Sequence, residues 1–325
     1  MESPLCSVVI ITWNRRREIE KALDSVFAQT CADRLEVVVI DNASQDDTVR
    51  WLREEYPHPV RLFRYERNMG CSISRNAGIR LARAPYVCFL DSDAAFLSRD
   101  AIERCVEYLR QHPGIRAVAG SIWLDSEKTR AFFRGGYVTV DGCFDHRRSY
   151  NETADPMFIS TCFAVWEKRL LEELRGFDPS FFYGGEDSDL AFRAWANARR
   201  GRKTAATRFH IVEGADVIHE MARTGRHFEA EFKANFECKE PLRLRLVFSY
   251  GGLWEFLRVL ARGPFRIGRM ERESFGRRLS WHDRWRATVW WPLRRLLALP
   301  FDYARSRRNH LALTAMPAPV PLAHK

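Results

Sequence analysis

Two aspartates one residue apart, Asp91 and Asp93, follow the apolar run PYVCFL at residues 85–90. If that run is a strand, side chains two residues apart lie on the same side of it, so both carboxylates point to one place. Like charges that close repel each other unless a cation, a proton or solvent relieves them. Carboxylate oxygens are ligands that suit Mg²⁺ and Mn²⁺. A solvated helix start, where Asp is a common cap, is the plainer interpretation, and the pair alone does not decide between the two.

A second acidic cluster follows the apolar segment FFYGG. Glu186, Asp187 and Asp189 fall in the first turn of a predicted helix. Acidic residues at a helix start interact favourably with the helix dipole, which accounts for one or two of them. A carboxylate that the apolar segment shields from water has a raised pKa, as a general base requires. The cluster is therefore a candidate source of a catalytic base.

One histidine, His219 in the segment VIHEM, is a candidate partner of the aspartates. A single histidine is more often a hydrogen-bonded structural residue than a ligand. Imidazole is, however, a common donor to divalent metals, and two carboxylates already await a cation. We therefore keep His219 as a candidate third ligand.

The first third of the chain alternates strand-like and helix-like segments, and these must position the polar residues. Apolar, strand-like runs occupy residues 7–12, 35–41, 60–66 and 85–90. Residues 17–29 instead carry apolar side chains at helical spacing. Strands alternating with helices predict an α/β fold with a mostly parallel sheet covered on both faces.

Polar residues stand at the ends of three of these strands. Thr12 and Asn14 follow the first strand, Asp41 ends the second, and Asp91 and Asp93 follow the fourth. Ligands of such sheets bind beyond the carboxyl ends of the strands. Polar residues are common in loops, but three converging ends predict a binding site.

Composition is that of a globular protein, with 46% hydrophobic and 29% charged residues. The eight cysteines form no CxxC pair, which indicates a reducing compartment and no zinc knuckle. The N-terminus lacks the basic region of a signal peptide. No run reaches the ~18 apolar residues that a spanning helix needs.

Charge is unevenly distributed along the chain. Residues 241–325 hold 17 Lys and Arg against 5 Asp and Glu, whereas the rest holds 35 against 37. The same segment contains five of the ten tryptophans. We predict a helical, basic extension over residues 226–311 and a disordered, proline-rich tail over residues 312–325.

Two interpretations of the basic extension stay open. Arginines on one side of a helix, with Trp and Leu on the other, are typical of a helix that lies on a membrane surface. The extension would then bring a cytoplasmic protein to the inner face of the cell membrane. Alternatively, the helices pack on the catalytic domain or on a second copy. Nucleic-acid binding is not expected, because no recognised module is present.

With these residues in view, the chain resembles glycosyltransferase family 2, whose members are inverting enzymes with the GT-A fold. The resemblance covers about residues 5–225, roughly two thirds of the chain, and residues 1–225 are the predicted catalytic domain. It depends on motifs in a fixed order: SVVIITWNR, VVVIDNASQDDT, ERNMGCSISRNAGIRLARAPYVCFLDSD, ISTCFAVWEKRLLEELRGFDPSFFYGGEDSDLAFRAW and VIHEM. A DxD motif alone is a weak signal. The resemblance implies a Rossmann-like, mostly parallel sheet with helices on both faces.

The resemblance also implies the residues that bind the nucleotide-diphosphate sugar: Thr12, Asn14, Asp41, Gly70, Arg75, Asn76, Asp91 and Ser92. Thr12 and Asn14 would line the pocket for the nucleobase and ribose, and Asp41 would hydrogen-bond the base. Gly70 would allow the backbone to approach the nucleotide closely.

For the chemical step, the resemblance implies that Asp93 and His219 hold Mn²⁺ or Mg²⁺ at the diphosphate. Asp187 would be the catalytic base, with Glu186 as its neighbour. The family often has a further acid after its DxD motif, whereas Ala94 stands here. Asp93 would therefore carry more of the metal's coordination.

The expected function is transfer of a sugar from the nucleotide donor to a carbohydrate or lipid-linked acceptor, in the synthesis of a cell-surface polysaccharide or glycolipid. A non-catalytic protein that binds nucleotide-sugar or scaffolds a glycan-assembly complex is the alternative. A dinucleotide-dependent oxidoreductase is disfavoured, because WNRRRE after the first strand offers no GxGxxG.

Overall fold

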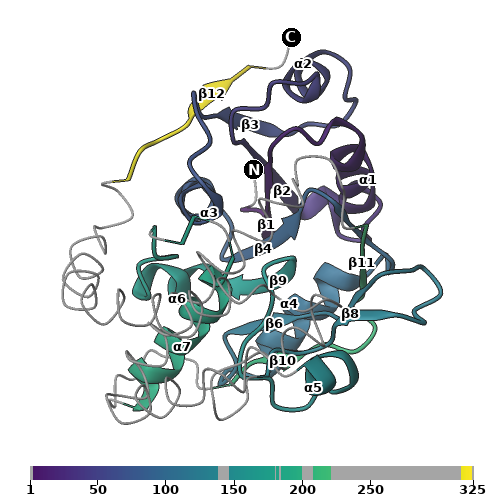
Figure 1. Ribbon diagram of the computed structural model, residues 1–325, viewed down its shortest axis with the longest axis vertical. Helices are drawn as coiled ribbons and strands as arrows, with labels where there is room; N and C mark the ends of the chain where they lie inside the picture. The colour runs from purple at the N-terminus through teal and green to yellow at the C-terminus, as the bar shows by residue number, and fades with distance from the viewer. Residues whose placement is uncertain are drawn as a thin grey trace, which may run out of the picture. The chain divides into compact units, whose positions relative to one another are not determined.

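The computed structural model describes residues 3–137, 146–179, 181–182, 184–199, 208–220 and 316–323. These residues contain two sheets and the helices around them (Figure 1). The predicted basic extension at residues 226–311 lies outside the described residues, so its helical character and its boundaries stay predictions. Within the described part, no helix is both long and apolar enough to cross a bilayer.

An eight-stranded sheet forms the centre, in the order β10-β6-β9-β4-β1-β2-β3-β12. Its strands are β1 (Cys6–Thr12), β2 (Leu35–Asp41), β3 (Arg61–Arg64), β4 (Tyr86–Asp91), β6 (Ala117–Ala119), β9 (Phe163–Glu167), β10 (His210–Ile211) and β12 (Val320–Leu322). Strand β1 pairs parallel with β2 and β4, and β2 pairs parallel with β3. Strand β9 runs antiparallel between β4 and β6. The predicted α/β class with a largely parallel sheet is confirmed.

Helices pack against the sheet through faces on which apolar side chains recur at helical spacing. They are α1 (Arg16–Phe27), α2 (Thr48–Glu54), α3 (Cys71–Leu81), α4 (Ala101–Gln111), α5 (His146–Asn151), α6 (Lys168–Glu173) and α7 (Glu186–Arg199). In α1 the buried side chains are Ile19, Ala22, Leu23 and Val26, the i, i+3, i+4, i+7 pattern of one helical face. Helices α1 and α2 lie on one side of β1–β3 and α3 on the other (Figure 1).

Helix α3 lies very close to the sheet. A Cβ on Gly78 would lie 2.2 Å from Cγ1 of Val9, so only glycine permits this approach. The helix consequently packs directly against β1, and the polar side chains at its N-terminal half come near the carboxyl ends of the central strands.

A second sheet of four strands, in the order β5-β11-β7-β8, determines the position of the histidine. Its strands are β5 (Ala94–Phe96), β11 (Val217–His219), β7 (Ile122–Trp123) and β8 (Ala131–Phe133). Strand β11 runs antiparallel to β5, with His219 opposite Ala94. Because Ala94 directly follows Asp93, this register places the histidine beside the second aspartate of the DxD motif.

The predicted disorder of residues 312–325 is wrong for residues 316–323. Strand β12 pairs antiparallel with the edge of β3, with Val320 opposite Arg64 and Leu322 opposite Leu62. The Tyr65 hydroxyl and an N–H of Arg80 both donate to the Pro317 carbonyl, at 3.0 and 2.9 Å. A proline-containing segment is compatible with an edge strand, since one side of such a strand needs no ladder hydrogen bonds.

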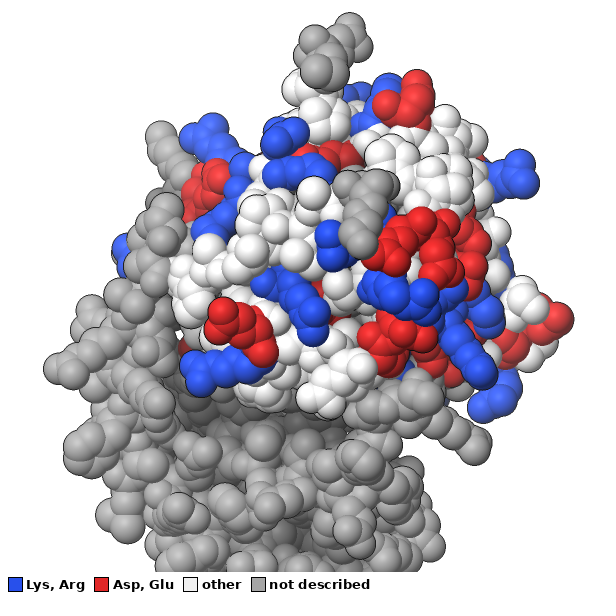
Figure 2. Space-filling view, turned by 90° about the horizontal axis from the view of Figure 1, so that it is seen from above, with Lys and Arg blue, Asp and Glu red and all other residues white. Residues whose placement is uncertain are grey.

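Charges on the face seen in Figure 2 are interleaved. Basic and acidic side chains lie next to one another rather than gathering into a patch of one sign. Ion pairs on α1 and α2 follow the same pattern, including Arg16 with Glu20 at 2.9 Å and Arg50 with Glu55 at 3.0 Å. Exposed pairs of this kind contribute little to stability, roughly 0–1 kcal/mol each.

Candidate active site

The carboxyl ends of three neighbouring parallel strands bring the predicted residues to one edge of the sheet. Thr12, the last residue of β1, is in register with Asp41, the last residue of β2. On its other side β1 pairs with β4, where Ile11 is in register with Asp91. Convergence of these strand ends, which the sequence predicted, is therefore a consequence of the parallel register.

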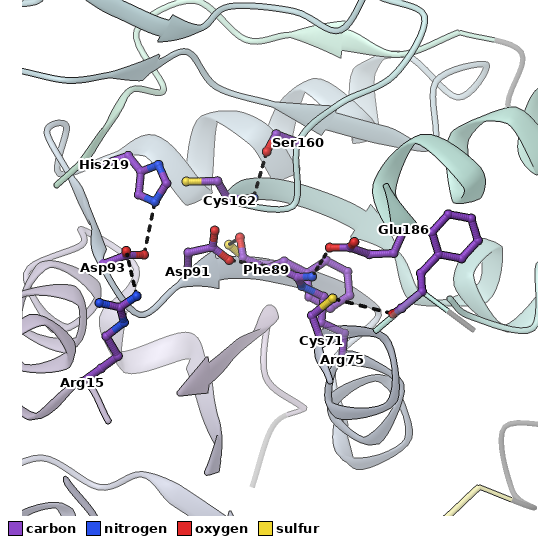
Figure 3. A network of polar contacts seen from close by, with 12 residues as sticks. Arg15, Cys71, Arg75, Phe89, Asp91, Asp93, Ser160, Cys162, Glu186 and His219 are labelled. Carbon is purple, nitrogen blue, oxygen red and sulfur yellow. Dashed lines mark hydrogen bonds and ion pairs between the residues drawn. The ribbon is translucent and has the colours of Figure 1, made fainter. Parts of the chain in front are cut away.

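Asp93 and His219 form one end of the site, which we call the metal end. The His219 Nε2 lies 3.2 Å from an Asp93 carboxylate oxygen, and both side chains are buried (Figure 3). The Glu220 backbone N–H donates to the Asp93 carbonyl at 3.0 Å, which continues the pairing of β5 with β11. Nδ1 of His219 has no hydrogen-bond partner among the described residues.

Arg15 also belongs to the metal end, and the sequence analysis missed it. One of its terminal nitrogens lies 3.8 Å from the second Asp93 oxygen. Arg15 follows Asn14 directly, so a basic residue at a strand end was the available signal. With Asp93 between a guanidinium and an imidazole, the carboxylate has donors on both sides (Figure 3).

A buried arginine connects the two acidic clusters. Arg75 donates to Asp91 at 2.9 Å and to Glu186 at 2.6 Å (Figure 3). Burial raises the pKa of Asp91, and the positive charge of Arg75 offsets part of that rise. Arg75 thereby bridges the DxD motif and the start of α7, which are about ninety residues apart in the chain.

Glu186 and Asp187 form the other end of the site, which we call the base end. Both lie in the first turn of α7, which begins after Gly184 and Gly185 with φ of 77° and 88°. Burial, followed by the negative charge of Glu186, raises the pKa of Asp187 to about 7, although the side chain keeps some solvent contact. The Ser188 N–H donates to Asp187 at 2.7 Å.

Asp189, the third acid of this cluster, has a structural role. Arg193 donates to it at 2.7 Å within α7, and the same guanidinium donates to the carbonyls of Leu174 and Gly176. Asp189 therefore holds Arg193 against the end of α6. This separates it in function from the two acids before it.

Of the residues near β1 and β2 that were predicted to bind the nucleotide, some have hydrogen-bond partners within the protein and one does not among the described residues. The Asn14 side-chain oxygen accepts from the Gln45 N–H at 2.7 Å, and Asp41 accepts from the Ser44 N–H at 3.1 Å. Burial raises the pKa of Asp41. The buried Thr12 hydroxyl, by contrast, has no partner among the described residues, so it is available to a ligand. Ser92 is buried in the turn between the two aspartates.

Two residues that were predicted to face the nucleotide have partners within the protein. A Cβ on Gly70, whose φ is 81°, would lie 2.7 Å from the Phe182 ring. The group that lies close to the Gly70 backbone is therefore Phe182. Asn76 donates to the Phe177 carbonyl at 2.8 Å and accepts from its N–H at 2.7 Å. Asn76 therefore anchors the chain before α7 to helix α3, and its contact with the nucleotide stays a prediction.

Cys162 is a further residue at this edge. The sequence analysis did not include it among the site residues. The Asp91 N–H donates to the Cys162 carbonyl at 3.0 Å, because β4 pairs with β9 up to that point. Ligand atoms of Asp91, Cys162 and His219 all lie within 4.8 Å of one another. Only the pairing of β4 with β9 brings Cys162 to this position, and the sequence carries no local signal for it.

Comparison with known proteins gives a consistent result. Residues 7–175 match the family described as Glycosyl transferase family 2. A glycosyltransferase of Nostoc sp. that is itself uncharacterized is 36% identical over 330 residues, covering 94% of this chain and 92% of that protein. Chondroitin synthase of Escherichia coli is 38% identical over 116 residues, or 35% of this chain and 17% of that protein. The chain spans between 17% and 40% of the length of the first curated relatives it matches.

A solved structure supports the same fold. A mannosyltransferase from Pyrobaculum calidifontis, in complex with GDP-Man and Mn²⁺, superposes with a TM-score of 0.56 at 19% identity. The superposition covers 97% of this chain and 87% of that one. At this level of identity the comparison supports the GT-A fold and does not extend to the substrate.

Proposed function

Because the chain belongs to glycosyltransferase family 2 and is thus a glycosyltransferase, we propose that it is an inverting, metal-assisted enzyme that uses a nucleotide-diphosphate sugar. The donor would bind at the carboxyl ends of β1, β2 and β4. Thr12, whose buried hydroxyl has no hydrogen-bond partner within the described ranges, is the best-supported contact for the nucleoside. Asn14 and Asp41 would contribute by shaping the loop after β2, since both are bonded to it.

Residues at the metal end suit a divalent cation. Asp93 offers carboxylate oxygens and His219 a ring nitrogen, both buried and in contact, and Nδ1 of His219 has no partner in the part of the chain that the structure describes. Mn²⁺ or Mg²⁺ held there would neutralise the charge that develops on the diphosphate as the sugar leaves. Arg15, beside Asp93, would add a positive charge at the same place.

Asp187 is our proposed base. A carboxylate with a pKa of about 7 is ionised in part at neutral pH and still basic enough to take a proton from an acceptor hydroxyl. The acceptor oxygen would form its bond to the anomeric carbon as the bond to the diphosphate breaks. Because attack comes from the face opposite the leaving group, one such step inverts the anomeric configuration.

The observation that carries this proposal is the bridge from Asp91 through Arg75 to Glu186. It fixes the start of α7 relative to the DxD motif, so a donor between the two ends would meet cationic groups at its diphosphate and a base near its sugar. Two acids with unrelated structural roles would not require a shared, fully buried guanidinium. Such an arrangement also disfavours the non-catalytic alternative.

For the acceptor, we propose a chemical class rather than a particular molecule. We propose a carbohydrate or lipid-linked acceptor in polysaccharide or glycoconjugate synthesis, because the relatives include a chondroitin synthase.

Thermal-shift screening of UDP-, GDP- and dTDP-sugars with Mn²⁺ identifies the donor, since a ligand raises the melting temperature only if the native site binds it. Donor turnover that needs Mn²⁺ or Mg²⁺ and is lost with EDTA supports the enzyme. Absence of turnover with every stabilising donor favours a binding or scaffold protein.

We also propose peripheral contact of the basic segment with an anionic membrane surface, on the sequence pattern alone. Replacing Arg284, Arg286, Arg294 and Arg295 by Gln is expected to weaken binding to phosphatidylglycerol vesicles roughly a thousandfold, at ~1 kcal/mol per charge. The matched control replaces four exposed arginines of the described part: Arg17, Arg99, Arg110 and Arg169. Equal loss in both variants, or binding by neither parent nor variant, contradicts the proposal.

A further inference from the structure

Three side chains from separate strands bring nitrogen, oxygen and sulfur together at the metal end. Asp91 ends β4, Cys162 precedes β9 and His219 ends β11. Their ligand atoms lie within 4.8 Å of one another, and Cys162 and His219 are only 3% and 4% exposed. The ring of His219 and the thiol of Cys162 are turned toward one another in Figure 3.

Available lone pairs point to a ligand at this cluster. Nδ1 of His219 is buried without a partner among the described residues. Arg75 occupies one oxygen of Asp91, which leaves the second oxygen for another contact. The Phe132 ring packs at an angle against His219, with centroids 5.3 Å apart. A buried imidazole nitrogen without a hydrogen bond is costly unless something binds it.

The chemistry of these donors selects a particular class of cation. Mg²⁺ and Mn²⁺ favour oxygen ligands, whereas thiolate and imidazole favour Zn²⁺ and related thiophilic ions. Zinc is commonly held by Cys, His and Asp together. Binding converts the Cys162 thiol to thiolate and releases its proton, so the charge of Zn²⁺ is balanced by one thiolate and one carboxylate.

We propose that Asp91, Cys162 and His219 form a site for a thiophilic divalent cation such as Zn²⁺, distinct from the Asp93–His219 site proposed for the catalytic metal. Both sites use His219, so zinc competes with the catalytic metal for it and inhibits the enzyme. The inhibition rests on the proposed function, whereas binding of the cation does not.

Binding is tested first without turnover, using Co²⁺ as a spectroscopic probe on the full-length, metal-stripped protein. A thiolate ligand gives a near-ultraviolet charge-transfer band, which the wild type is expected to show and Zn²⁺ to abolish. Cys162→Ser should lose the band, whereas Cys71→Ser, which changes a more exposed cysteine, should keep it. No band in the wild type, or a band that survives in Cys162→Ser, overturns the site.

A second measurement needs no variant and covers the case in which Cys162→Ser fails to fold. Alkylation of each cysteine by iodoacetamide is followed by mass spectrometry with and without Zn²⁺. Because a coordinated thiolate reacts slowly, Zn²⁺ is expected to slow modification of Cys162 at least roughly tenfold. An unchanged rate at Cys162 contradicts the proposal.

Inhibition is measured on Mn²⁺-supported donor turnover. The inhibitory Zn²⁺ concentration is expected to rise at least roughly tenfold in Cys162→Ser. If the cobalt band is present but no donor turns over, the proposed function fails and the cation site stands. If donors turn over but the band is absent, only the cation site fails. Equal zinc inhibition of wild type and Cys162→Ser overturns the competition.

Discussion

Strand pairing positions the metal end of the site, whereas one helix start and one buried arginine position the base end. Asp93 directly precedes β5 and His219 ends β11, so the backbone pairing of these strands, continued by the Glu220 N–H to the Asp93 carbonyl, defines their separation. Glu186 and Asp187 depend on the turn at Gly184 and Gly185 and on the ion pair to Arg75. Backbone pairing tolerates side-chain changes, so the two ends should respond differently to substitution.

The largest effect is expected at the base end. Asp187→Asn removes the proton acceptor and should lower kcat by roughly 10²–10⁴-fold, with donor and Mn²⁺ affinity retained. Steady-state kinetics and Mn²⁺ titration measure the two quantities separately. Asp33→Asn, an exposed change of the same kind, is the control. A kcat within a factor of a few of the wild type would remove Asp187 from the mechanism.

Arg75→Met should have the next largest effect, on stability as well as activity. It leaves Asp91 and Glu186 with no cation between them, and breaking a buried pair costs about 3–5 kcal/mol of unfolding free energy. Urea unfolding measures the loss, and adding Glu186→Gln should restore part of it. Arg116→Met is the matched control, because Arg116 also bridges two carboxylates, but its side chain is more exposed than that of Arg75, at 14% against 7%. Equal losses for the two arginines would contradict a special role for Arg75.

At the metal end, Asp93→Asn is expected to weaken Mn²⁺ binding by at least roughly tenfold while the fold stays intact. The pairing of β5 with β11 uses the backbone of Asp93, so the melting temperature without metal should change little. Electron paramagnetic resonance of free Mn²⁺ measures the affinity. Unchanged affinity in this variant would place the cation elsewhere.

The pH dependence should separate the two ends again. Because the pKa of Asp187 is raised to about 7, the base is protonated below that value and kcat/KM should fall roughly tenfold per pH unit on the acid side. The raised pKa also makes stability depend on pH. Because the folded state keeps Asp187 protonated to a higher pH than the unfolded chain does, the free energy of unfolding falls as pH rises from the ordinary Asp pKa to about 7. Asp187→Asn should therefore raise the melting temperature more at pH 8 than at pH 5. An acid limb near the ordinary Asp pKa contradicts both expectations.

The smallest effect concerns the attachment of the edge strand β12. Tyr65→Phe removes the hydrogen bond to the Pro317 carbonyl and should cost about 1 kcal/mol of unfolding free energy, with activity unchanged. Urea unfolding and kinetics measure both. A loss of activity would show that β12 affects the active site, and would contradict the expectation that it contributes to stability alone.

The sequence predicted the metal end better than the base end, and the reason is the range of the interactions. Asp91 ends a buried strand and Asp93 lies in the turn that follows it, so the local sequence predicts that both lie at the carboxyl edge of the sheet. The ion pair of Arg75 with Glu186 joins residues 111 positions apart, and no local pattern encodes it. Gly70 and Asn76 were assigned to the nucleotide by the resemblance, and no local pattern shows their contacts with Phe182 and Phe177, more than a hundred positions away in the chain.

Strand pairing between distant segments explains why the sequence analysis missed the place of Cys162 and the strand around Val320. Cys162 reaches Asp91 only because β9 inserts antiparallel beside β4. The segment around Val320 contains prolines on both sides, which favours a prediction of disorder, and only the open edge of β3 makes it a strand. Periodicity predicts elements well, but which distant elements become neighbours depends on packing that it does not contain.

Stereochemistry of the product tests the central claim most directly. With the donor that stabilises the protein most, the anomeric protons of the released sugar are followed by NMR during hydrolysis, before mutarotation equilibrates them. Attack opposite the diphosphate, assisted by Asp187, predicts that the inverted anomer appears first and that Asp187→Asn slows its formation. First appearance of the retained anomer would contradict the single displacement on which the account depends.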